Sequence, residues 1–113
     1  MDSVKTGQIF LNSGVASNTP LQIISPTANV AGAIIRTATI QVYGNGGCYL
    51  CVGKTAPIGG ANNMAIPFSY IASQYSCAVT PRSIEVPAGD GLWFYANAVG
   101  GGGVNITYDL FSA

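Results

Sequence analysis

Charged side chains are scarce in this sequence, and histidine is absent. Asp, Glu, Lys and Arg make up only 7% of the residues, whereas an average soluble protein has roughly 25%. The four acids balance the four bases, so the formal net charge is zero. The lack of a basic patch argues against nucleic acid as a partner. Because an uncharged surface gives little repulsion between copies, we expect the chain to associate with itself, as a homodimer or homotrimer.

Long apolar runs are missing as well. No stretch reaches the roughly 18 residues that a membrane-spanning helix needs, so no membrane partner is expected. The first residues, Met1–Thr6, lack the basic and then apolar pattern of a signal peptide, which predicts synthesis in the cytoplasm. In such a reducing compartment Cys48, Cys51 and Cys77 are expected to be free thiols.

The sequence offers little material for catalysis. Without histidine, a Ser or Cys nucleophile has no ordinary base. A carboxylate pair could in principle hydrolyse a glycosidic bond. However, Asp90 fits a turn beside Gly91, and Glu85 and Asp109 fall on the polar phase of expected strands. We therefore predict no catalytic residues, which makes a small lyase or hydrolase the weakest alternative.

Cys48-Tyr49-Leu50-Cys51 has the CxxC spacing of some zinc and redox sites. The four residues lie inside an expected strand, where positions three apart point to opposite faces. Only Cys77 remains as a further thiolate, and a thioredoxin-like site needs a βαβ unit that the pattern does not contain. We predict no metal site and no cofactor.

The sequence does contain short alternations of apolar and polar residues, bounded by Gly, Pro and Asn. The expected strands are residues 8–12, 21–25, 33–43, 48–54, 75–79, 83–86, 92–98 and 104–111. Residues 64–73 are ambiguous: they form either a covering loop or a strand, which Pro67 would place at a sheet edge. About eight strands at this spacing predict one domain over residues 1–113, an antiparallel β-sandwich of jelly-roll type.

Asn45-Gly46 is the strongest local turn signal in the chain, because both residue types tolerate a positive φ. It predicts a hairpin in which residues 33–43 pair with residues 48–54. Within the first of these strands, the alternation places Ile34 on the face of Ala38 and Ile40, with Ile35 on the other face.

The aromatic residues are the remaining candidates for a binding site. A sugar-stacking platform could draw on Tyr43, Tyr49, Tyr70, Tyr75, Trp93, Tyr95 and Tyr108. Trp93 and Tyr95 share one phase of the strand over 92–98, and Tyr43 ends the strand over 33–43. If exposed, these three residues could contact a glycan or a partner protein. The same rings could equally well fill a core, so the sequence leaves both possibilities open.

The run from Ile84 to Ala96, IEVPAGDGLWFYA, resembles a pattern near the C-terminus of small jelly-roll-like proteins of tailed bacteriophages. The similarity extends through the Gly-rich connection to residue 110. It implies an accessory protein of the virion, either a capsid decoration (cement) protein or a small tail protein. The implied partner is the major capsid protein or another virion protein. The alternative is a receptor- or glycan-binding module of a phage tail or another adhesive assembly.

Overall fold

The computed structural model describes residues 6–58 and 63–112, and these residues contain strands but no helix. The nine strands are β1 (Ile9–Val15), β2 (Leu21–Ile24), β3 (Ala33–Val42), β4 (Gly46–Gly53), β5 (Ala65–Ala72), β6 (Ser76–Val79), β7 (Ile84–Val86), β8 (Gly91–Ala98) and β9 (Gly102–Leu110). No helix in the described part of the chain is long and apolar enough to cross a membrane.

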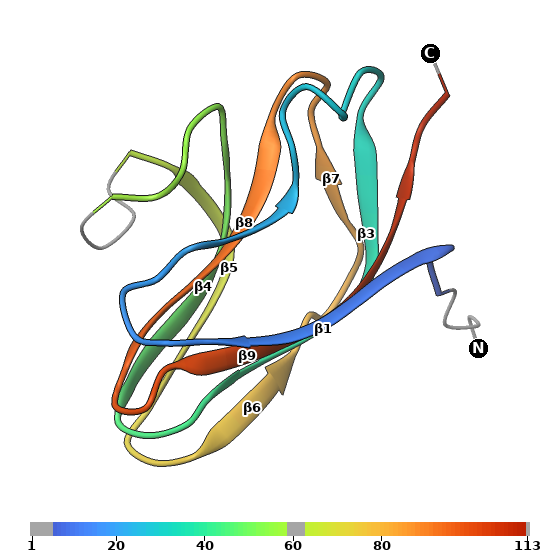
Figure 1. Ribbon diagram of the computed structural model, residues 1–113. Coiled ribbons are helices and arrows are strands. Elements are labelled where there is room, and N and C mark those ends of the chain that lie inside the picture. Colours follow the sequence, from blue (N-terminus) through green and yellow to red (C-terminus); the bar gives the residue numbers. More distant parts are fainter. Residues whose placement is uncertain (1–5, 59–62, 113) are drawn as a thin grey trace.

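The strands form two antiparallel sheets that pack face to face (Figure 1). One sheet has the order β1-β9-β3-β6, with β7 also paired to β3, and the other has the order β2-β8-β4-β5. Since β6 and β7 pair with different parts of the same edge of β3, they act as one interrupted strand. The fold then has the eight strands of a jelly roll, and nearly every connection crosses between the sheets. The predicted β-sandwich is confirmed.

The predicted hairpin at Asn45-Gly46 is wrong. β3 pairs with β9, β6 and β7, whereas β4 pairs with β5 and β8 in the opposite sheet. Asn45 does not have a positive φ, although Gly46 does, at 144°. β3 pairs along most of its length with β9, and β4 pairs along its whole length with β8. Each strand thus has neighbours on both edges in its own sheet, and the two strands face each other across one core. Non-local pairing therefore overrides the local turn signal.

The main core lies between the sheets. Its largest fully buried side chains are Phe94, Ile35, Ile40, Leu50, Leu92, Ile106, Val42, Val86 and Val104. A register shift in β3, between Ile35 and Thr37, reverses the alternation at the start of that strand. Ile35 is consequently buried in the core while Ile34 is only half-buried, so the face predicted for Ile34 is wrong.

Asn29, in the connection from β2 to β3, holds two loops together at the end of the sandwich where β7 leads into β8. Its side chain is fully buried. Its amide Nδ2 donates to the backbone carbonyls of Pro87, at 2.8 Å, and Asp90, at 2.9 Å. These bonds satisfy the buried donor and fix the turn between β7 and β8.

Candidate functional site

Four loops gather at one end of the sandwich, toward the lower left of Figure 1. In one sheet, β1 and β3 both end opposite Gly102, the first residue of β9. In the other sheet, β4 begins at Gly46, opposite the last residues of β5 and β8. The loops at this end are residues 16–20, 43–45, 73–75 and 99–101. None of them contains a charged residue, and we call this region the uncharged end.

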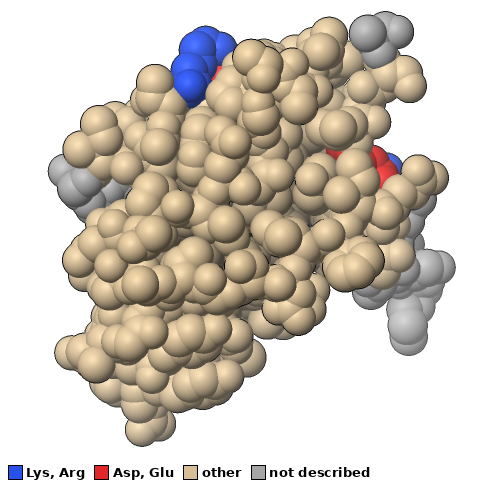
Figure 2. All heavy atoms as spheres, in the orientation of Figure 1, with Lys and Arg blue, Asp and Glu red and all other residues tan. Residues whose placement is uncertain are grey.

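The described charges lie elsewhere. Lys54 pairs with Asp90 at 2.8 Å, and Arg36 pairs with Asp109 at 3.1 Å. Figure 2 shows acidic and basic atoms only toward the upper part of the visible face, while the lower part is uniformly uncharged. Asp2 and Lys5 lie outside the described residues. On this face, the charged side chains that the structure describes therefore lie away from the uncharged end.

An exposed pair of aromatic rings marks the uncharged end. Tyr43 and Tyr75 stack with their ring centroids 5.8 Å apart and their planes 14° apart. Tyr43 is 38% exposed and Tyr75 is 63% exposed. The Tyr75 hydroxyl donates to Oε1 of Gln41 at 3.2 Å. The hydroxyl of Tyr43 lies so close to Gly14 and Gly103 that a Cβ at either glycine would collide with it. The two rings therefore rest on the outer face of the sheet β1-β9-β3-β6.

Trp93 and Tyr95 lie on the outer face of the sheet β2-β8-β4-β5, but they are not free to bind a ligand there. Each ring is 4% exposed, and together with Cys51 they form a second buried cluster, onto which Tyr49 and Met64 pack. The Tyr95 hydroxyl donates to Oδ1 of Asn18 at 2.8 Å. Of the three aromatic residues singled out from the sequence, the structure brings only Tyr43 to the surface.

The three cysteines occupy three different environments. Cys48 lies in the main core, Cys51 lies in the second cluster on the other face of β4, and Cys77 is exposed on β6. The prediction that Cys48 and Cys51 point to opposite faces is confirmed. Burial raises the pKa of Cys48 to about 12 and that of Cys51 to about 11. Within the described residues, no group of three or more His, Cys, Asp or Glu side chains could hold a metal ion.

These environments predict selective thiol reactivity. Only the thiolate is nucleophilic, and the raised pKa values together with burial keep Cys48 and Cys51 protonated and inaccessible near pH 8. We expect a disulfide reagent such as DTNB to modify only Cys77 in the folded protein, and all three cysteines in denaturant. The Cys77→Ser variant should react slowly in the folded state. Rapid modification of that variant under native conditions would contradict the burial of the other two thiols.

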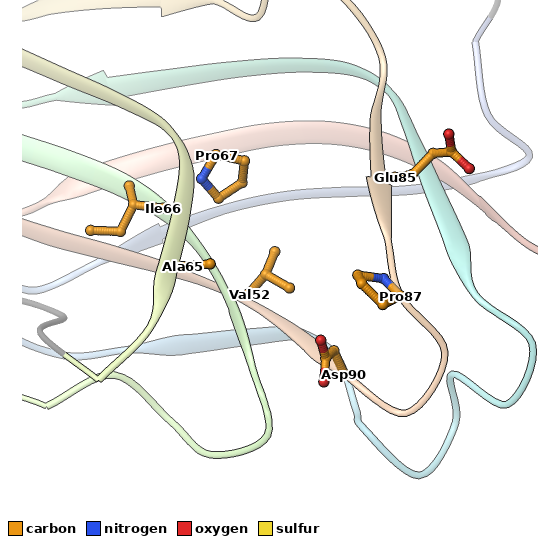
Figure 3. Close-up of a pocket in the computed structure, with 7 residues that line it drawn as sticks. All are labelled: Val52, Ala65, Ile66, Pro67, Glu85, Pro87 and Asp90. Atoms are coloured by element: carbon orange, nitrogen blue, oxygen red, sulfur yellow. The ribbon is translucent and has the colours of Figure 1, made fainter.

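A groove of about 320 Å³ opens at the opposite end of the sandwich, between the edge strands β5 and β7. Its lining residues are Val52, Ala65, Ile66, Pro67, Glu85, Pro87 and Asp90. Figure 3 shows the Glu85 carboxylate pointing away from Asp90 and from the apolar lining. Asp90 is already paired with Lys54 at 2.8 Å. The two carboxylates therefore do not face each other across a position where a substrate could sit.

The sequence did not single out Ile71 or Val99, which lie with Tyr43 and Tyr75 at or next to the uncharged end. Both are more than half exposed. They come from a strand end and a connection, so no spacing along the chain links them to Tyr43. Comparison with known proteins finds no matching family model, no matching curated protein and no matching solved structure.

Proposed function

We propose that this chain is a structural protein of a virion, a capsid decoration protein that docks on neighbouring subunits of the major capsid protein through its uncharged end. The observation that carries the proposal is the presence of exposed apolar and aromatic side chains in loops that have no charge. Tyr43, Tyr75 and Val99 supply this surface, and Ile71 is exposed near the adjoining end of β5. Exposed apolar side chains that lie together in a patch are typical of surfaces that bind other proteins.

The surrounding chemistry agrees with a binding role. Jelly rolls occur in viral capsid proteins and in lectins, so the architecture suits either an assembly role or an adhesive one. An interface made by the uncharged end would rest on apolar burial and hydrogen bonds instead of ion pairs. Such an interface is weakened little by salt, because few charges are present to be screened.

A docking experiment on expanded capsid shells that lack this protein tests the proposal. We expect binding to differ little between about 50 mM and about 500 mM salt. Val99→Asp should lower the affinity about tenfold or more, because it places an unpaired charge in the contact. Val30→Asp is the matched control. Val30 is 68% exposed against 70% for Val99, and it lies in the connection from β2 to β3, at the other end of the sandwich.

Equal affinity of both variants for the shells would show that the uncharged end is not part of the interface. No binding of the unmodified protein to the shells would overturn the decoration role. Circular dichroism should show that Val99→Asp and Val30→Asp both keep the fold of the unmodified protein.

A glycan- or receptor-binding role is the second candidate, and the Tyr43–Tyr75 stack is the observation that favours it. Two parallel, exposed rings offer a flat apolar surface on which a sugar could lie. A glycan array, run in parallel with the shell assay, separates the two roles. Selective binding of a sugar that is lost in Tyr75→Ala would replace the decoration role with an adhesive one.

A further inference from the structure

The two sheets have four outer edges, and three of them carry features that block pairing with another chain. β2 has only four residues, has a register shift against β8, and lies between Pro20 and Pro26. β5 contains Pro67. The edge formed by β6 and β7 is interrupted by a segment with Pro81 and Arg82. Short length, proline, charge and irregular register are the usual protections of an exposed sheet edge.

β1 has none of these protections. It is a continuous strand of seven residues, Ile9–Val15, without proline or charge. All seven residues pair in regular register with β9, and in the described structure β1 has no strand on its other side. The alternate backbone N–H and C=O groups on that side are therefore available to another strand.

We propose that the occupant of this edge is a second copy of the chain, and that two copies pair antiparallel through β1 about a two-fold axis. Asn12 is the middle residue of β1. A register centred on Asn12 lets every residue of the strand pair with the partner copy. In a two-fold contact each residue meets its symmetry counterpart, so Asn12 lies opposite Asn12 of the partner copy.

This register would cover Phe10, which is 76% exposed, more than any other large apolar residue that the structure describes. Phe10 lies opposite Gly14 of the partner copy, two residues from the axis. Gly14 has no side chain, and the hydroxyl end of Tyr43 lies close to it. Each Phe10 ring can then cover a glycine and contact the edge of a tyrosine in the other copy. Aromatic residues opposite glycine stabilise antiparallel pairs.

Electrostatics permit this self-pairing. A symmetric strand pair brings like charges close together whenever the strand is charged. The chain has no charged residue from Thr6 to Ile35, so the joined strands carry no such repulsion. The dimer would extend the sheet β1-β9-β3-β6 sideways, and at the uncharged end Phe10 of the partner copy would touch the hydroxyl edge of Tyr43. The pairing is independent of the proposed function and would hold for an adhesive protein as well.

Charge substitutions on the axis test the pairing. Sedimentation velocity at protein concentrations from about 1 to about 100 μM measures the mass of the assembly. We expect the full chain to have twice its monomer mass of 11.5 kDa. Asn12→Lys places two lysines against each other and should weaken the dimer about tenfold or more. Asn12→Glu should do the same. A mixture of the two variants should restore the dimer, since opposite charges then meet at the axis.

Asn105→Lys is the matched control, because Asn105 is the β9 residue that pairs with Asn12 and it is also exposed. This variant should remain dimeric. A monomer at every concentration would overturn the proposal. So would loss of the dimer in Asn105→Lys but not in Asn12→Lys, which would indicate a contact through the sheet face. Failure of the mixture to associate would contradict the two-fold register.

A cross-linking measurement covers the case in which a charged variant does not fold. Directly opposite residues of antiparallel strands have Cα atoms about 4.5–5.5 Å apart, within the range that a disulfide spans. In a Cys77→Ser background, Asn12→Cys should form a covalent dimer on oxidation, whereas Asn105→Cys should not. If strands of a different protein occupy this edge instead, the Asn12→Cys variant will not cross-link to itself.

Discussion

Replacing Trp93 with Ala is expected to lower the free energy of unfolding by about 3–5 kcal/mol, the usual cost of truncating a buried tryptophan. Trp93 is 4% exposed and packs with Cys51 and Tyr95 under Met64. Its ring also lies directly over Gly91, where even a Cβ would collide with it. Removing the ring would leave a cavity on the outer face of the sheet, beside Met64 and Tyr49.

Urea unfolding followed by far-UV circular dichroism measures this loss, because the variant lacks the only tryptophan of the chain and so the usual fluorescence probe. Tyr75→Ala is the control. Tyr75 is well exposed, and its truncation should change the stability by about 0.5 kcal/mol or less. A Trp93→Ala variant as stable as the unmodified protein would show that the ring does not hold the fold together. The same result would make Trp93 a candidate for contacting a ligand.

Gly46→Ala should destabilise the fold by about 2–6 kcal/mol, for two separate reasons. The φ of Gly46 is 144°, a conformation that costs a residue with a side chain about 1–3 kcal/mol. In addition, a Cβ at this position would collide with the backbone of Asn97 and Ala98 in the neighbouring strand. Relieving that collision requires β4 and β8 to separate, at a further cost of about 1–3 kcal/mol.

Gly89→Ala separates the two contributions. Gly89 also has a positive φ, at 83°, but the nearest atom to its added Cβ is the Lys54 ammonium at 3.6 Å. This variant should therefore lose only the conformational part, about 1–2 kcal/mol. If both variants melt at the same temperature, the contact between Gly46 and β8 does not limit the packing of these two strands.

The proposed binding surface was less accessible from the sequence than the strands were. Of the residues that the sequence suggested, Tyr43 lies at the uncharged end, while Trp93 and Tyr95 are buried by neighbours from other strands and loops. Alternation along a strand separates its two faces. It does not reveal whether the outer face is covered by a remote segment, as Met64 and Tyr49 cover this one. The stack of Tyr43 on Tyr75 likewise joins residues that are distant along the chain.

The sequence by itself determined the local features of this protein. Alternating apolar residues between glycines and prolines specify strands, and strand geometry sends Cys48 and Cys51 to opposite faces. Each of these follows from the conformational preferences of a few neighbouring residues. Pro67 restricts any strand over residues 64–73 to a sheet edge, and the structure shows that this segment is the edge strand β5 and not a loop.

Only the tertiary structure decided which strands pair. β3 pairs with β9, near the other end of the chain, while the local signal at Asn45-Gly46 favours a hairpin with β4. The register shift in β3 likewise exchanges the faces of Ile34 and Ile35. Strand pairing and burial depend on how two sheets enclose one core, and the free energy of that enclosure is shared by residues far apart in the sequence. The exposed edge of β1 and the uncharged end follow from this arrangement, so they become visible only in the folded chain.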